Sequence, residues 1–344
     1  MAYTTIKKPT DYFNTLDYNG NGSNRSIIDV GFQPDWVWLK RRDQASFHYI
    51  FDSIRGVQKK ISSNSTAAET TVSTSLTSFD SDGFGLGTEG DVNESGGTYV
   101  SWNWLASNTT ASNTDGSITS TVSANTTSGF SIVSYTSTGS NATVGHGLGE
   151  APAMIIFKRR SGDTENWVVY HKSLGATKHL KLNLTDAENT SSERFNNTEP
   201  TSSVFSLGIS GDVNGGTSPF IAYCFAEKKG FSKFGSYTGN GNADGTFVYT
   251  GFKPAFTMIK RTDTTSDWNI MDNKRAVSFN PNTKELYANS SQAEATGGQT
   301  IRDFLSNGFK LRGTSGGTNA SGGTYIYMAF AEEPLVGDNP ATAR

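Results

Sequence analysis

Apolar and polar residues alternate along much of the chain, as they do in strands that bury one face. The stretch FSIVSYT (130–136) alternates in this way, and SWNWLA (101–106) and IYMAFA (326–331) do so on at least one face. Asn-Gly, Asp-Gly and Gly-Gly clusters separate these short stretches, which favours antiparallel hairpins. The pattern predicts an all-β protein.

Three further stretches are apolar at nearly every position. They read WVWL (36–39), MIIF (154–157) and FTMI (256–259). A strand of a β-sandwich normally buries only one face. The second face of each stretch must therefore be covered by a neighbouring module, a second chain or an overlying loop.

The chain contains three copies of one ordered pattern, which indicates an internal repeat. Each copy has a Pro, a Lys, an Asn-x-x-x-Ala-Glu segment, a Phe, a Gly-Gly-Thr motif and a closing apolar strand. The anchors are Pro34, Pro152 and Pro254; Lys40, Lys158 and Lys260; Asn64 to Glu69, Asn183 to Glu188 and Asn289 to Glu294; Phe84, Phe205 and Phe309; Gly96, Gly215 and Gly322. We predict three tandem antiparallel β-sandwich modules of jelly-roll-like form, each of about 100 residues, a size that can bury its own core.

The predicted boundaries are 1–106 for the first module, 107–228 for a linker and the second module, and 229–344 for the third module with a short tail. Residues 107–129 are nearly devoid of apolar side chains, so we expect a linker followed by one exposed strand. The junction at 227–230 is short, so modules two and three should touch. The modules could meet around a pseudo-threefold axis, as a pseudo-trimeric monomer, or the chains could form a homo-oligomer, with a trimer favoured.

Composition narrows the classes of partner. Ser, Thr and Asn supply 41, 42 and 27 of the 344 residues, and charged residues only 18%. The net charge of −3 argues against nucleic acid and anionic membranes as partners. A single cysteine, Cys224, excludes an intrachain disulfide, and no apolar run is long enough to insert into a membrane. We expect a protein assembled in a reducing cytoplasm.

The residues that could carry catalysis do not recur. The four histidines occupy positions that hold other residues in the other copies, and the carboxylates shared by all three copies are Glu69, Glu188 and Glu294. Each glutamate could act as a general acid, but a hydrogen-bonded turn suits its surroundings better. We therefore predict no enzyme activity and no cofactor.

Two other motifs have a structural and a functional interpretation. Asp91-x-Asn93-x-Ser95-Gly96 resembles the start of a calcium loop, but Trp102 stands where the bidentate glutamate belongs, so we predict a Gly-rich hairpin loop and no metal. The recurring Lys-Arg pairs at Lys40, Lys158 and Lys260 could bind an anionic sugar or a phosphate. The preferred interpretation is a solvated strand end that discourages edge pairing.

An aromatic or imidazole ring recurs four or five residues before an acidic or imidazole side chain. Exposed rings beside carboxylates form sugar-binding platforms, whereas buried rings would simply be core. The candidate ligand-binding residues are His48, Asp52, Trp167, His171, Trp268 and Asp272. Both interpretations are open at the level of the sequence.

Several phrases together resemble a family of tailed-phage virion proteins, found among marine and cyanobacterial phages and described as tail fibre or structural proteins. The phrases are NGNGSNRSI, GFQPDWVWLKRRD, FDSDGFGLG, GGTYVSWNWLA, TDGSITSTVSANTTSGFSIVSYT, GFKPAFTMIKRTD and SGGTYIYMAFAEEP. The resemblance covers about residues 10–335. It implies a β-rich virion appendage exposed on the particle, in contact with other virion proteins, and without enzyme activity.

Three functions follow as hypotheses. The first is a bacteriophage virion surface protein, a tail fibre or other appendage, that contributes to host attachment through cell-surface glycans. The second is a capsid or tail decoration protein with a purely structural role. The third is a glycan-cleaving tailspike enzyme, which the repeat length disfavours because such enzymes are often parallel β-helices with short stacked repeats.

Overall fold

The computed structural model describes residues 3–276, 280–296, 300–338 and 340–341. These residues form 28 strands, four α-helices of four residues each and one 3₁₀ turn, η1 (Pro9–Asp11). All the pairings between named strands are antiparallel. The prediction of an all-β fold with antiparallel sheets is confirmed.

The first repeat folds into two main sheets and a small ribbon. The larger sheet has the order β1 (Phe13–Asn19), β9 (Thr98–Trp104), β3 (Trp36–Arg41) and β4 (His48–Asp52). The smaller sheet has the order β2 (Arg25–Ile27), β8 (Gly83–Leu86) and β7 (Leu76–Asp80). The ribbon pairs β5 (Lys59–Lys60) with β6 (Thr70–Thr71), and α1 (Gly90–Asn93) precedes β9.

The second repeat carries the largest sheet. Its order is β10 (Ala111–Asn113), β11 (Ser120–Asn125), β12 (Phe130–Thr136), β19 (Pro219–Phe225), β14 (Met154–Arg159), β15 (Val168–His171), β16 (Lys178–Lys181) and β17 (Asn189–Thr190). A separate pair joins β13 (Ala142–Gly145) to β18 (Val204–Leu207), with α2 (Ser192–Phe195) and α3 (Gly211–Asn214) beside them. The segment predicted as a linker with one exposed strand instead supplies the edge strand β10 and its neighbour β11, which is paired on both sides. Val122 on β11 is buried because its side chain packs on the second repeat's core.

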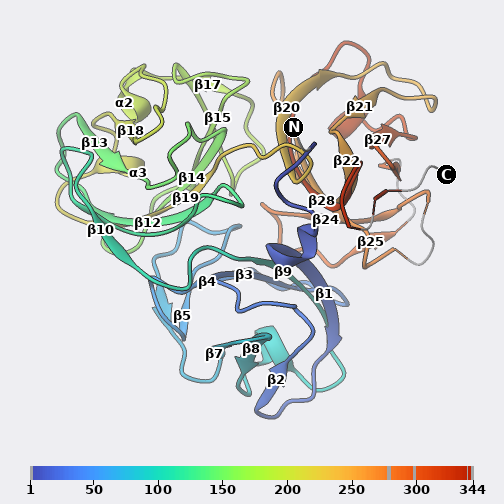
Figure 1. The fold of residues 1–344 in the computed structure, drawn as a ribbon, viewed down its shortest axis with the longest axis horizontal. Coiled ribbons are helices and arrows are strands. Elements are labelled where there is room, and N and C mark those ends of the chain that lie inside the picture. Colours follow the sequence, from blue (N-terminus) through green and yellow to red (C-terminus); the bar gives the residue numbers. More distant parts are fainter. Residues whose placement is uncertain (1–2, 277–279, 297–299, 339, 342–344) are drawn as a thin grey trace.

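The third repeat has its equivalent strands in the same order as the first repeat. Its larger sheet runs β20 (Ser232–Thr238), β28 (Thr324–Pro334), β22 (Phe252–Arg261), β23 (Trp268–Asp272), β24 (Lys284–Tyr287) and β25 (Ala295–Thr296). The smaller sheet runs β21 (Phe247–Tyr249), β27 (Gly308–Leu311) and β26 (Arg302–Leu305), and α4 (Gly316–Asn319) precedes β28. Figure 1 shows the three groups of sheets as lobes around a common centre.

One arrangement recurs in all three lobes. The closing apolar strand lies between the first long strand of the repeat and the strand after the proline anchor: β9 between β1 and β3, β19 between β12 and β14, and β28 between β20 and β22. The Gly-Gly-Thr motif supports the turn into this strand with a left-handed residue, at φ 80° for Gly96, 60° for Gly216 and 73° for Gly322. That each repeat is a separate sandwich domain of jelly-roll-like form stays a prediction.

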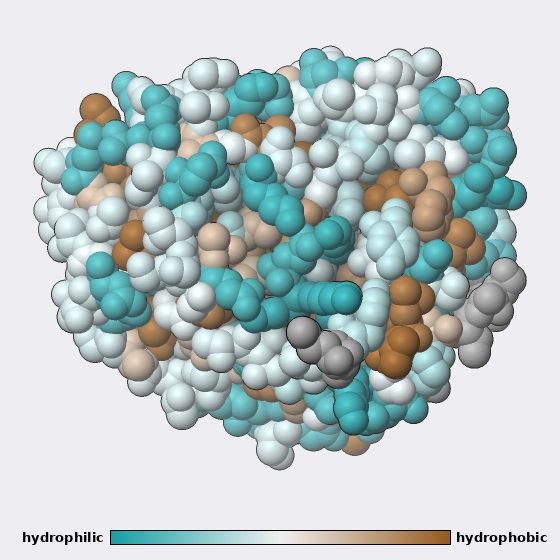
Figure 2. All heavy atoms as spheres, turned by 45° about the horizontal axis from the view of Figure 1, so that its top comes forward, coloured by the Kyte–Doolittle hydropathy of each residue, from teal (hydrophilic) through white to brown (hydrophobic). Residues whose placement is uncertain are grey.

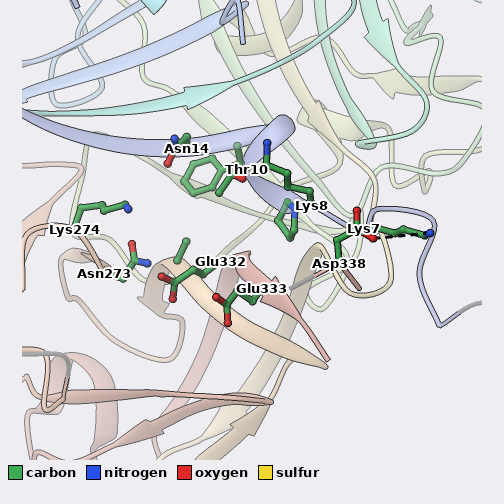
Figure 3. Close-up of a pocket in the computed structure, with 12 residues that line it drawn as sticks. Lys7, Lys8, Thr10, Asn14, Asn273, Lys274, Glu332, Glu333 and Asp338 are labelled. Carbon is green, nitrogen blue, oxygen red and sulfur yellow. Dashed lines mark ion pairs between the residues drawn. The ribbon is translucent and has the colours of Figure 1, made fainter. Parts of the chain in front are cut away.

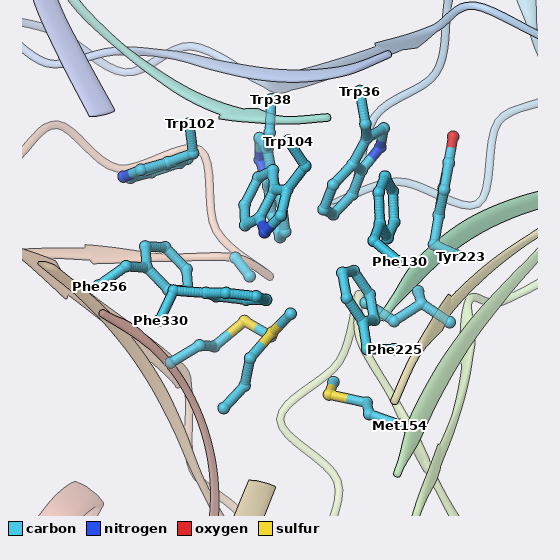
Figure 4. Packing of buried hydrophobic residues seen from close by; sticks show 14 of the residues in the cluster. Trp36, Trp38, Trp102, Trp104, Phe130, Met154, Tyr223, Phe225, Phe256 and Phe330 are labelled. Carbon is cyan, nitrogen blue, oxygen red and sulfur yellow. The ribbon is translucent and has the colours of Figure 1, made fainter. Parts of the chain in front are cut away.

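The three lobes share one aromatic centre. Equivalent residues of the three closing strands, Trp104, Phe225 and Phe330, point toward one another (Figure 4). Their ring centroids are 6.5 Å (Trp104–Phe225), 5.6 Å (Trp104–Phe330) and 6.0 Å (Phe225–Phe330) apart. All three rings are buried, so the chain closes a pseudo-threefold core around them.

The doubly apolar strands explain how this core forms. On β3, Trp36 and Trp38 enter the shared central cluster, while Val37 and Leu39 face a separate cluster under the smaller sheet of the first repeat. The same division occurs on β14 and β22. The prediction that both faces of these strands are covered is confirmed, and within the chain the cover on the inner face is the other two repeats.

Candidate functional site

The six residues proposed for ligand binding lie inside the protein. Each of the six residues is at most 1% exposed. A ring with no exposed face cannot stack on a sugar, so the surface-platform interpretation does not fit these residues and the core interpretation does. They do not gather in one pocket but lie at three contacts between repeats.

We call these contacts junction A (repeats one and two), junction B (repeats one and three) and junction C (repeats two and three). Buried polar groups of one repeat bond to the next, as buried polar groups must. The bonds of the candidate residues are Trp167 Nε1 to Ser62 O (2.8 Å) and Tyr223 Oη to Asp52 Oδ2 (2.7 Å) in junction A, Trp102 Nε1 to Asp272 Oδ2 (2.9 Å) in junction B, and Trp268 Nε1 to Lys181 O (3.0 Å) and His171 Nε2 with Tyr327 O (3.2 Å) in junction C.

His48 lies at junction B and accepts a bond from Trp38 Nε1 at its Nδ1 (2.9 Å). Burial holds the pKa of His48 well below its usual range, and the charge of Lys40 acts in the same direction. Burial likewise lowers the pKa of His171 to about 4. Both imidazoles are therefore neutral at pH 7 and act as hydrogen-bonding members of the core.

The recurring lysines are part of the same junctions. Lys158 Nζ donates to Thr66 O (2.9 Å) across junction A, Lys260 Nζ donates to Thr185 O (3.1 Å) across junction C, and Lys40 Nζ lies 3.4 Å from Ser291 O across junction B. The expectation of a solvated strand end is wrong for these three side chains, which are at most 1% exposed. Burial lowers the pKa of each to about 8.

The shared glutamates are also junction residues. In junction A, Glu69 binds Arg160 (3.0 Å) and Arg55 (3.2 Å); in junction B, Glu294 binds Arg42 and Arg275 (both 2.9 Å). Burial raises the pKa of each carboxyl, but the arginines outweigh it and the net shift is downward. A carboxylate held ionised in this way is poorly suited to general acid catalysis.

The loop that resembles a calcium site is occupied by protein bonds. Asp91 accepts from Tyr49 Oη (2.7 Å) and Lys60 Nζ (3.1 Å). Asn93 is buried and donates to the carbonyl oxygens of Ser23 (2.7 Å) and Gly87 (2.8 Å). Within the described ranges, no three His, Cys, Asp or Glu side chains are grouped so that they could hold a metal ion.

A surface groove offers a better candidate site. It lies where the N-terminal segment crosses the third repeat, and its volume is about 300 Å³ (Figure 3). Buried Pro9, Phe13 and Ala255 contribute apolar surface to it. Its polar lining comes from Lys7, Lys8, Thr10, Asn14, Asn273, Lys274, Glu332, Glu333 and Asp338.

Several charged side chains of this groove have ion-pair partners. Lys7 pairs with Asp338 (4.0 Å), Lys8 with Asp11 (2.5 Å) and Glu332 with Lys253 (3.0 Å), while the buried Asn273 Oδ1 has no hydrogen-bond partner among the described residues. Apolar surface with a few convergent polar groups is typical of small-molecule sites, and this volume is at the lower end of their range. The groove thus suits a small polar ligand.

Sequence reasoning missed this groove because its residues come from segments that are far apart along the chain. Lys8 and Glu332 are separated by more than 300 residues, and the polar residues that line it are not repeat anchors. Only the packing of η1 against β28 brings these residues together, and no local sequence motif predicts that contact.

The face shown in Figure 2 carries hydrophilic and weakly polar residues, with apolar residues in small separate patches. The described helices are four residues long, far shorter than a bilayer span.

The fold and its junctions define a class: a β protein whose three sequence repeats share one aromatic core. The chain belongs to the family defined by a domain of unknown function, DUF7483, which matches residues 8–334. No curated protein and no solved structure matches the chain.

Proposed function

We propose that the chain is a non-enzymatic surface protein of a bacteriophage virion, a tail fibre or other appendage, which contributes to host attachment by binding cell-surface glycan. The observation that carries the glycan part is the groove beside β28, with its apolar surface and its amide, carboxylate and ammonium groups. Amide and carboxylate oxygens accept bonds from sugar hydroxyls, and lysines complement acidic sugars. The resemblance to phage virion proteins supports the location.

A decoration protein that stabilises the particle is the second candidate. The shared core favours it, because three lobes that close on Trp104, Phe225 and Phe330 make a rigid unit without a ligand. In either role the partners would be other virion proteins, and the chain would act as a homo-oligomer, with a trimer favoured, or as a pseudo-trimeric monomer.

Two experiments test this proposal separately. Immunogold labelling of phage particles tests the location: label on tails supports an appendage, label on capsids supports decoration, and unlabelled particles contradict both. A glycan array with the purified full chain tests attachment.

Asn273→Ala should weaken glycan binding at least tenfold, because it removes the acceptor with no partner. The control is Asn141→Ala on the exposed surface of the second repeat, which should bind as the wild type does. Equal binding by both variants, or release of oligosaccharide from host polysaccharide, would contradict the proposed attachment role.

A further inference from the structure

The three junctions share one backbone contact. The shared glutamate of each repeat donates its N–H to a carbonyl of the neighbouring repeat, two residues after the buried lysine. The bonds are Glu69 N to Arg160 O (2.9 Å), Glu294 N to Arg42 O (2.8 Å) and Glu188 N to Thr262 O (2.9 Å). Positions 42, 160 and 262 therefore occupy the same place in junctions B, A and C.

Arginine fills this place in two of the three junctions. Arg160 binds Glu69 through two parallel bonds, Nε to Oε2 (3.0 Å) and Nη2 to Oε1 (3.2 Å). Arg42 binds Glu294 in the same way, at 2.9 and 3.1 Å. This bidentate geometry is particular to a planar guanidinium and a carboxylate.

Junction C lacks both arginines of the other junctions. Thr262 replaces the arginine of the neighbouring repeat, and Leu174 stands where Arg55 and Arg275 stand, three residues after His171 rather than Asp52 or Asp272. Among the described residues, Glu188 forms an ion pair with Lys178 alone. The result is a cavity of about 460 Å³ between the second and third repeats.

The cavity lies at the place that corresponds to the guanidinium groups of the other two junctions. Glu188, Lys178 and Leu174 line it from the second repeat, and Thr262, Thr324 and Ser236 from the third. The Thr262 and Thr324 hydroxyls bond to each other at 2.7 Å. The polar groups of the lining are the Glu188 carboxylate, the Lys178 ammonium and Ser, Thr and Tyr hydroxyls, so carboxylate and hydroxyl oxygens are present to accept hydrogen bonds.

We propose that the cavity of junction C binds a guanidinium group, with Glu188 as its bidentate acceptor and Thr262 beside it. The group could belong to an arginine side chain of a partner protein or to free arginine, and both share this chemistry. The inference rests on the internal comparison of junctions and does not depend on where the protein resides or on glycan binding.

Calorimetric titration of the full chain tests the proposal with blocked arginine (Nα-acetyl-arginine methylamide), the corresponding lysine compound, and free arginine. Blocked arginine should bind at least tenfold more tightly than blocked lysine. Tighter binding of free than of blocked arginine assigns a free amino acid as the ligand, and equal or weaker binding assigns a protein side chain. Absence of binding by both arginine compounds, or equal binding of arginine and lysine compounds, would overturn the proposal.

Two variants locate the binding. Glu188→Gln should lose at least tenfold in affinity because it removes the carboxylate. Thr262→Arg should place the chain's own guanidinium in the cavity, which would abolish binding and raise the melting temperature relative to a surface control, Thr109→Arg. Unchanged affinity in Glu188→Gln would overturn the proposal even if Thr262→Arg did not fold.

Discussion

Junctions A and B differ from junction C in the charged side chains that they bury. The first two each bury an Asp–Arg pair and join it to a glutamate and a second arginine from the next repeat. Junction C replaces the Asp–Arg pair with His171 and Leu174 and keeps an open cavity. All three retain the buried lysine, the backbone bond of the glutamate and the shared aromatic centre.

This difference indicates which contacts define the assembly of the repeats. Junction C forms without the ion network. The features common to the three junctions are therefore sufficient to position the lobes relative to one another. Buried ion pairs often add little net stability over a well-packed neutral alternative, although breaking one partner is costly. We infer that the aromatic centre holds the three lobes together. The arginine networks modify the stability of junctions A and B only.

The strongest test of that division is Trp104→Ala at the centre. The indole contacts Phe225 and Phe330 from both other repeats, so its loss opens a cavity that all three junctions border. We expect the free energy of unfolding to fall by about 3–5 kcal/mol, measured by urea denaturation.

The control for Trp104→Ala is Phe247→Ala on β21, a ring that is 43% exposed. Its effect should stay within about 0.5 kcal/mol. Similar losses in the two variants would show that the shared centre has no special role.

A second test converts junction A toward the composition of junction C. Arg55→Leu leaves Asp52 buried with only the Tyr223 hydroxyl as a neighbour-repeat partner, and we expect a loss of about 3–5 kcal/mol in urea denaturation. The double variant Asp52→His/Arg55→Leu copies the His–Leu pair of the second repeat. It should recover most of the loss, which a double-mutant cycle measures directly. A double variant as unstable as Arg55→Leu would mean that the ion network itself is required.

The sequence predicted the strands and recurring residues on which this comparison rests, but not the bonds that these residues make. Alternation and the doubly apolar strands correctly implied an all-β fold whose strands at Trp36 and Met154 are covered on both faces. The sequence predicts the recurring lysines as solvated strand ends that discourage edge pairing, whereas the structure buries all three side chains. Their acceptors are backbone carbonyls of Thr66, Thr185 and Ser291, which leave no trace in the side-chain pattern.

The candidate sites could be predicted even less. The Trp and Asp positions were correctly aligned between repeats, yet only the folded chain shows that Trp167 and Asp52 meet the neighbouring repeat instead of solvent. The cavity of junction C is lined by Leu174 and Thr262 at the positions of two arginines in the other junctions, a difference that becomes informative only when the three junctions are compared. Long-range packing decides both outcomes, and local sequence does not encode it.

The smallest expected effect concerns the imidazole that replaces a carboxylate in junction C. His171 accepts from Ser173 N at Nδ1 (3.2 Å), so Nε2 carries the proton that faces Tyr327 O. Burial lowers its folded-state pKa to about 4, against about 6.5 in an unfolded chain. Between these values the unfolded state binds a proton that the folded state does not, so stability must fall as the pH drops from about 6.5 to about 4.

One such proton contributes a slope of about 1.4 kcal/mol per pH unit inside this window. Burial lowers the pKa of His48, His146 and His179 as well, so the wild type should lose stability more steeply than one group alone would cause. Urea midpoints measured at several pH values should show that His171→Gln is less steep by about one proton, whatever its stability at pH 7. Parallel curves for the two proteins would mean that His171 takes up its proton equally in the folded and unfolded states, so that junction C would bury a charged imidazole in addition to Lys260.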